Sequence, residues 1–256
     1  MKEQIHTVPV NEAFDSGDEC PFCYLERQAE RSAIRYTLGP GASYMEPDVR
    51  AATDDAGFCG THLKKLYDYG NTLGSALMLQ THFEDVLEQF DREMAREGKP
   101  AKKSLFGKKK EEGASRGTWL RDRVGSCYVC EKIDYTMDRY WRTFFYMLKE
   151  PEFRQKVEQS KGFCLRHFRE LLASAAENLP NSQREWFYHT VFAKMEENLA
   201  RVKEDLDWFV CKNDYRYAGA DWKNSRDALA RAIQKLQGLY PADPPYKSAD
   251  FGIRRK

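Results

Sequence analysis

The feature that most constrains the fold of this chain is a cysteine and histidine pattern that occurs twice. In both halves of the 256 residues, a Cys-x-x-Cys pair is followed about 35 residues later by Gly-Phe-Cys-x-x-His. Three thiolates and one imidazole can fill a closed tetrahedral metal site. Combining each pair with the motif that follows it predicts two sites, one of Cys20, Cys23, Cys59 and His62 and the other of Cys127, Cys130, Cys164 and His167.

The two motif sets also indicate an internal duplication. The second set follows the first at a nearly constant separation of about 105 residues, and Glu-Pro-Asp-Val-Arg at 46–50 matches Glu-Pro-Glu-Phe-Arg at 150–154. We therefore expect a first helical module at 18–98, a flexible lysine-rich linker at 99–117 and a second helical module at 118–212. A tail helix at 213–256 is expected to pack on the bundle.

The spacing of apolar residues predicts an all-α fold, an internally duplicated helical bundle with two zinc-stapled modules. Helices are expected at 24–38, at 73–94, after Cys130, at 188–209 and at about 225–237, whereas 42–57 is expected to be a loop. The stripe at 73–94 predicts one buried face made of Leu73, Ala76, Leu79, Phe83, Val86, Phe90 and Met94. The stripe at 188–209 predicts a seam that packs on another long helix, made of Tyr188, Phe192, Met195, Leu199, Val202, Leu206 and Phe209.

Each ligand pair is expected at the start of a helix. The unpaired N–H groups and partial positive charge of a helix N-terminus favour a thiolate over a thiol. Gly57 and Gly162, which precede the Phe-Cys of each motif, would allow the backbone to bend into the turn.

The ligand set predicts two zinc ions per chain with a structural role, because a filled tetrahedron has no open position for a substrate. Iron–sulfur clusters are the alternative, since they also use cysteine ligands. Disulfides are disfavoured, because they are typical of shorter secreted chains. A dithiol redox role is also open, although that motif usually accompanies a βαβ unit.

Candidate residues for a function beyond folding are few. His82 and His189 occur at similar points of the two long helical stretches, and could face a shared ligand cleft if the modules pack as a pair. The alternative is that both are ordinary hydrogen-bonded histidines. Cys211 is expected to be a buried, unreactive thiol. No catalytic residues are identified, because the phosphate-loop, GxSxG and HExxH motifs are absent from the sequence, so an enzyme is disfavoured.

Composition gives little support for charged partners. The formal net charge is +1, so no overall field attracts nucleic acid or an anionic membrane. Nucleic-acid binding through the lysines of the linker is a third possibility, disfavoured because no aromatic residues alternate with those lysines. No apolar run is long enough to span a membrane, and residues 1–20 lack a signal-peptide pattern, so a cytoplasmic location is expected.

The chain resembles an uncharacterised bacterial family, a domain of unknown function with duplicated CxxC and GFCxxH motifs. Some members of this family are labelled as ABC-transporter substrate-binding proteins. The resemblance rests on the two cysteine–histidine sets, on Tyr69-Gly70-Asn71 and on Asp214-Tyr215-Arg216, and it spans the chain except for the linker. It implies one structural unit and brings no activity.

The sequence therefore favours a binding or scaffolding protein whose metal sites are structural. Its partner would be an unknown protein or small-molecule ligand held between the two modules. A redox protein or enzyme with iron–sulfur clusters is the alternative.

Overall fold

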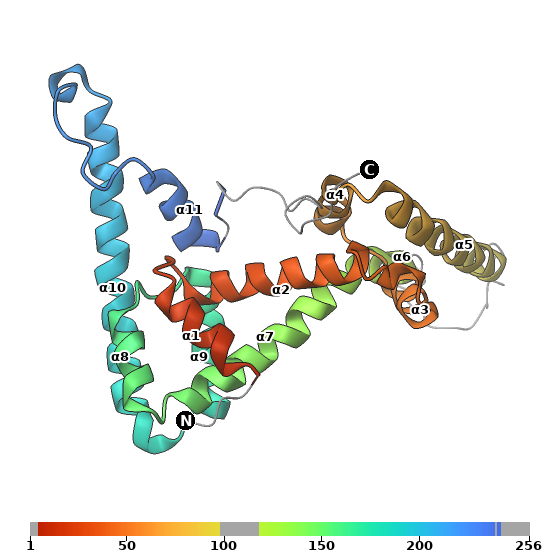
Figure 1. Cartoon of the computed structure of the whole chain (residues 1–256), viewed down its shortest axis with the longest axis horizontal. Coiled ribbons are helices and arrows are strands. Elements are labelled where there is room, and N and C mark those ends of the chain that lie inside the picture. Colours follow the sequence, from red (N-terminus) through yellow and green to blue (C-terminus); the bar gives the residue numbers. More distant parts are fainter. Residues whose placement is uncertain (1–4, 98–117, 239, 242–256) are drawn as a thin grey trace, which may run out of the picture. The chain divides into compact units, whose positions relative to one another are not determined.

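The structure is a computed structural model that describes residues 5–97, 118–238, 240 and 241. Within these residues the chain forms eleven α-helices and two 3-10 helices and no strand, which confirms the all-α fold class (Figure 1). The linker predicted at 99–117 lies outside the described residues. None of the described helices combines the length and apolar character needed to cross a membrane.

Each predicted helix has a counterpart in the structure, which also contains several short helices that were not predicted. Those of the first half are α1 (Thr7–Asp15), α2 (Pro21–Leu38), η1 (Ser43–Met45), α3 (Pro47–Ala56), α4 (Gly60–Tyr69) and α5 (Thr72–Glu97). Those of the second half are α6 (Thr118–Gly125), α7 (Tyr128–Met147), α8 (Pro151–Gln159), α9 (Leu165–Asn178), α10 (Asn181–Lys212), η2 (Tyr215–Tyr217) and α11 (Ala228–Gln237). Gly238 ends α11, in the left-handed conformation that favours glycine.

The order of elements is the same in the two halves. In each half a long helix that begins beside a Cys-x-x-Cys pair is followed by a short helix with proline in its first turn, by the Gly-Phe-Cys turn and by two further helices. The backbone repeats as well, because Glu46 and Glu150 are both extended immediately before the proline that starts the short helix. The duplication itself stays a prediction.

The chain divides into two compact units, and each unit combines segments from both halves of the sequence. Of the described residues, unit 1 contains those at 5–29 and from 135 onward, and unit 2 contains those at 30–97 and 118–134. The predicted modules at 18–98 and 118–212 were consecutive, whereas these units interleave. The boundaries fall within the long helices α2 and α7.

The core of unit 1 is a cluster of buried phenylalanines. Phe14 contacts Phe144, Phe153 and Phe163, with ring centroids 5.7, 5.1 and 6.5 Å apart, and Phe22 lies 6.0 Å from Phe163. Burying each ring contributes roughly 1.5–3 kcal/mol. Phe22 lies between Cys20 and Cys23, and Phe163 precedes Cys164, so this core directly supports the cysteine turns of unit 1.

The prediction of a loop at 42–57 was wrong, because residues Pro47–Ala56 form α3. Pro47 takes the first helical position, where its missing N–H costs no hydrogen bond. Val49, Thr53 and Ala56 form the buried face of this helix. Three buried residues make too short a stripe to stand out by periodicity, but Glu-Pro before a polar turn was an available signal.

The buried face predicted for α5 was also wrong. Leu73, Phe83, Phe90 and Met94 are exposed, and over residues 72–95, whose burial is described, the buried ones are Gly74 and Met78. α5 packs against α3 and η1. Polar contacts orient it, since Thr81 Oγ1 donates to Asp54 Oδ1 over 2.7 Å. The spacing of apolar residues could not show that a polar residue of α5, Thr81, faces α3.

The seam predicted on α10 packs mainly against short helices. Met195 and Val202 are buried as expected, and α10 packs against the short helices α8 and α11, which lie beside it in Figure 1. The long helix α7 contacts α10 through Phe145 and Phe187, which lie outside the predicted seam, with ring centroids 5.9 Å apart. Phe192 in the same seam stays 52% exposed.

Candidate metal centres

All four cysteine motifs stand at helix starts, as predicted. Cys20 immediately precedes α2, and Cys127 immediately precedes α7. Cys59 and Cys164 are the N-cap residues of α4 and α9, with nearly the same extended backbone angles. Each helix start thus directs a thiol or imidazole toward a point just beyond its own N-terminus, where the helix dipole favours negative charge.

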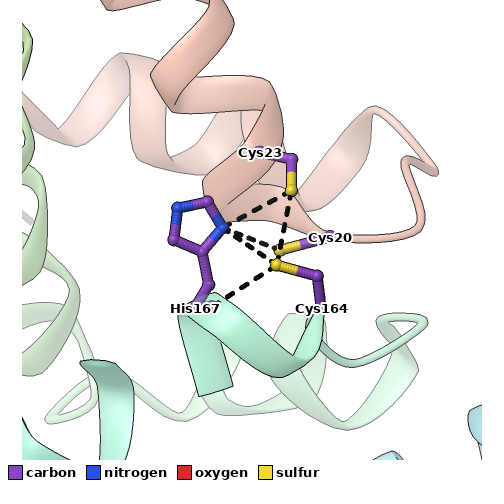
Figure 2. Close-up of side chains that lie close together, drawn as sticks. All are labelled: Cys20, Cys23, Cys164 and His167. Carbon is purple, nitrogen blue, oxygen red and sulfur yellow. Dashed lines mark hydrogen bonds between the residues drawn. The ribbon is translucent and has the colours of Figure 1, made fainter. Parts of the chain in front are cut away.

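The first cluster, site A, consists of Cys20, Cys23, Cys164 and His167, all of which are buried. Figure 2 shows the Nδ1 atom of His167 directed at the three sulfur atoms. It lies 3.4 Å from the Sγ atoms of both Cys20 and Cys23, and 3.3 Å from that of Cys164. Cys23 Sγ and Cys164 Sγ are 3.6 Å apart.

The second cluster, site B, consists of Cys59, His62, Cys127 and Cys130. The Nδ1 atom of His62 lies 3.3 Å from the Sγ atoms of Cys59 and Cys127 and 3.4 Å from that of Cys130. Cys59 Sγ and Cys130 Sγ are 3.9 Å apart. His62 and Cys127 are buried, whereas Cys59 and Cys130 are only half-buried.

The ligand sets predicted from the sequence were therefore wrong in their pairing, although all eight residues belong to the two clusters. The structure exchanges the motifs, so that each Cys-x-x-Cys pair meets the Cys-x-x-His of the other half. His62 contacts Glu30 in the middle of α2, which is seven residues beyond Cys23 and so about 10 Å further along the helix. Because the two copies of each motif are equivalent, the sequence offered no signal to choose between the pairings.

Both clusters have the dimensions of a mononuclear tetrahedral site. Around a zinc ion, tetrahedral geometry places two sulfur ligands about 3.8 Å apart, and a sulfur and a nitrogen about 3.5 Å apart. The sulfur–sulfur separations of 3.6 and 3.9 Å and the sulfur–nitrogen separations of 3.3–3.4 Å match these values. The sulfur pairs are also far too distant for disulfides, and all seven cysteines are free. Each cluster can therefore hold one metal ion.

Electrostatics within each cluster favours a thiolate. In site A, hydrogen bonds from Cys20 and Cys23 lower the pKa of Cys164, and the bond to Cys164 raises the pKa of Cys23. In site B, burial opposes ionisation, but the hydrogen bond with His62 lowers the pKa of Cys127 to about 6. Thiolates are the form in which cysteine binds metals.

Two glutamates of α2 face the outer nitrogens of the ligand histidines. His62 Nε2 lies 3.1 Å from Glu30 Oε1, and His167 Nε2 lies 3.8 Å from Glu26 Oε2. The contact with Glu30 is within hydrogen-bond distance, and such a carboxylate fixes the orientation of the ring and leaves Nδ1 for the metal. Glu26 is too distant for a hydrogen bond to His167 and instead accepts hydrogen bonds from Arg166. Burial would raise the pKa of Glu30, but hydrogen bonds from His62 and Lys65 outweigh it and lower that pKa.

These two glutamates were not predicted from the sequence. Glu26 and Glu30 follow Cys23 by three and seven residues, and this helical spacing puts all three on one face of α2. That spacing was the available signal.

The glycine before each Phe-Cys adopts the backbone conformation that was predicted to need it. Gly57 has φ 60° and Gly162 has φ 73°, a region that side chains rarely enter. A Cβ atom added at Gly57 would also lie 2.7 Å from Cε1 of His82. The turn into site B therefore requires glycine for both its conformation and its packing.

We expect Gly57→Ala to destabilise the protein by about 1–3 kcal/mol through backbone strain, with the steric conflict adding to the loss. Gly60→Ala is the matched control, because Gly60 has no atom within 4 Å of an added Cβ and begins α4. There the change should be neutral or slightly stabilising, as alanine favours helices. Urea unfolding of the two variants measures the difference, and equal midpoints would contradict the argument.

A model of one protein family, described as a family of unknown function (DUF6062), matches residues 1–243. The chain belongs to this family. No curated protein and no solved structure matches the chain. Membership in DUF6062 confirms the resemblance seen in the sequence motifs. The family description names no activity, so evidence about function comes from the two clusters.

The structure places His82 and His189 in different surroundings. His82 belongs to unit 2, where its Nδ1 lies 3.0 Å from Asp54 O and its ring lies against Gly57. His189 belongs to unit 1 and is exposed on α10. The nearest atoms to Gly57 belong to His82, whereas the nearest atoms to Gly162 belong to Lys194 and Met195. His189 is therefore not the counterpart of His82 at this turn. The shared ligand cleft stays a prediction.

Cys211 is exposed near the end of α10, which contradicts the prediction that it is buried. Its neighbour Lys212 is the residue that turns inward at this point, where its Nζ atom donates to the carbonyls of Tyr217 and Ala218.

Proposed function

We propose that this DUF6062 protein binds two zinc ions as structural cross-links and acts as a binding or scaffolding protein. The observation that carries the proposal is the geometry of the two clusters. In each, three sulfurs and one imidazole nitrogen lie within 4.8 Å of one another, close enough to bind a single ion together. A site with four protein ligands has no open position, whereas catalytic zinc sites usually keep one for water or substrate.

Zinc is favoured by the donor set and by the short separations. Three thiolates and one imidazole are a common ligand set of structural zinc sites. All ligand atoms of a cluster lie within 4.8 Å of one another. An iron–sulfur cluster places several irons and sulfides among its ligands, so its ligand atoms must be further apart than those of a single ion.

The structural role is supported by the length of chain that each ion would close. Site A joins helix starts 141 residues apart in the sequence, and site B joins helix starts 71 residues apart. Cross-links that close long loops restrict the unfolded chain strongly, and structural zinc contributes roughly 10–16 kcal/mol in small finger peptides. The ions would thus hold each unit as a rigid group of helices.

The binding part of the proposal is supported by exposed apolar side chains. α5 carries Leu73, Phe83, Leu87, Phe90 and Met94, each of them 44–68% exposed. Large exposed apolar groups of this kind usually mark contact surfaces. We propose that the partner is a protein or small-molecule ligand recognised by the assembled helices.

The metal content of the tag-free full chain tests the proposal directly. After purification under anaerobic conditions, we expect about two zinc ions per chain and no visible absorption, because zinc has a filled d shell. Elemental analysis by mass spectrometry together with an absorption spectrum makes the measurement. Iron and sulfide with a brown chromophore would overturn the zinc assignment and favour electron transfer or redox sensing.

A further inference from the structure

The two metal centres differ in how completely the protein covers them. All four ligands of site A are at most 1% exposed. In site B, Cys59 and Cys130 are only half-buried, so two of its four ligand residues are partly exposed to solvent. Access to a metal–thiolate bond is what allows a competing ligand to attack it.

The backbone connection between the two cysteine turns also differs. In site B the N–H of Tyr128, which follows Cys127, donates to Gly57 O over 2.9 Å and joins the two turns directly. The residue that follows Cys20 in site A is Pro21, which has no N–H to donate. Site A therefore cannot form the same bond.

Lys235 of α11 supplies the missing connection in site A. Its Nζ donates to Glu19 O over 2.6 Å and to Lys161 O over 2.5 Å. Glu19 directly precedes Cys20, and Lys161 precedes the Gly-Phe-Cys turn that leads to Cys164. One buried ammonium group thus joins both turns of site A, and Lys235 itself is only 1% exposed.

The charge of Lys235 suits this place as well. A zinc ion with three thiolates and a neutral imidazole carries a net charge of −1, and a buried net charge is costly unless it is compensated. Glu19, 4% exposed, is paired with Arg201 and Lys235 at 2.6 and 3.3 Å. These two cations exceed the single carboxylate, which leaves positive charge next to the thiolates.

α11 is held firmly enough to act as a cover for site A. The guanidinium of Arg231, itself buried, contacts Asp205 of α10 at 2.8 Å. Gln234 Nε2 donates to Asp18 Oδ1 over 2.6 Å, and Asp18 Oδ1 accepts from the N–H of Cys20. At the end of the helix, a Cβ atom on Gly238 would lie 3.2 Å from Cys164 Sγ, so the chain passes directly over the cluster.

From these contacts we infer that the two sites release their metal ions at different rates. Site A is locked by α11 through Lys235, which is a positioning residue for its cysteine turns. Site B is the exchangeable centre, from which a competing thiol or chelator takes the ion first. The inference rests on the proposed function, since it requires that both sites bind a metal ion.

Chelator kinetics on the zinc-loaded full chain tests the inference. Excess 4-(2-pyridylazo)resorcinol reports zinc release by its colour, and we expect one equivalent to leave fast and one slowly. Cys130→Ser should remove the fast phase only. Lys235→Met should accelerate the slow phase by about 10- to 100-fold, the range known for residues that support metal ligands. Lys212→Met is the matched control, another buried lysine that donates to two carbonyls, those of Tyr217 and Ala218, neither of which adjoins a cysteine turn, and it should leave both phases unchanged.

Pulsed alkylation of the unaltered protein gives an independent readout if Lys235→Met does not fold. Iodoacetamide should label Cys59, Cys127 and Cys130 before Cys20, Cys23 and Cys164, as mapped by mass spectrometry of peptides. Two zinc ions that leave at one rate, or earlier labelling of the site A cysteines, would overturn the inference while leaving the proposed function intact. Failure to load two zinc ions at the outset would instead overturn the proposed function.

Discussion

The variant in which Cys20 and Cys164 are both replaced by serine should retain one of its two metal ions. The variant in which Cys20 and Cys59 are both replaced should retain neither against a weak chelator. The reason is that Cys20 and Cys164 belong to site A, whereas Cys59 belongs to site B. Elemental analysis after dialysis measures the metal content of each purified variant.

Stability measurements on the same variants provide a thermodynamic cycle. The first substitution in a site abolishes tetrahedral coordination, so a second one in the same site should add little, whereas substitutions in different sites should add fully. Metal contents in the opposite order, with Cys20→Ser and Cys59→Ser leaving one ion bound, would restore the pairing expected from the sequence. Either result decides which motifs share an ion.

Single substitutions of the ligands should cost far more stability than the substitution of the remaining cysteine. We expect Cys164→Ser and Cys59→Ser each to lower the free energy of unfolding by several kcal/mol, because a structural zinc ion contributes roughly 10–16 kcal/mol in finger peptides. Cys211→Ser should change it by less than about 0.5 kcal/mol, because Cys211 is exposed and belongs to neither cluster.

Thermal or denaturant unfolding in buffer without added metal measures these differences. Cys164→Ser should have the larger effect of the two ligand variants, since its site is fully buried and adjoins the phenylalanine core. Equal melting temperatures for all three variants would contradict a structural role for the metal. A control with Glu177→Ala, an exposed position of α9, gives the scatter expected from a neutral surface change.

Much of the local structure could be predicted because it depends on nearby residues. The helical stretch after Cys23 and the stop at Gly39-Pro40 give α2, and the glycine requirement at Gly57 and Gly162 is visible from the motif alone. The faces of the helices were less predictable. Thr81 of α5 contacts Asp54 of α3, so a polar face of α5 packs against its neighbour. The apolar stripe of α5, which would ordinarily be buried, stays exposed.

The roles of particular polar residues depended on distant contacts. His82 packs against Gly57, and Lys235 joins the carbonyls of Glu19 and Lys161, more than 70 residues away in sequence. Neither residue differs in its local sequence from an ordinary helical residue. Only the positions of the neighbouring segments give them a role at the metal centres.

The sequence by itself determined which eight residues can bind metal and that each motif begins a helix, because ligand type and spacing are local properties. Only the tertiary structure decided which motifs share an ion. Two equivalent Cys-x-x-Cys pairs and two equivalent Cys-x-x-His motifs allow either pairing with the same local chemistry. The pairing follows from contacts between segments that are distant in the sequence: His62 Nδ1 lies 3.3 Å from Cys127 Sγ, and Cys23 Sγ lies 3.6 Å from Cys164 Sγ. A metal ion bound at either cluster would therefore join one half of the sequence to the other.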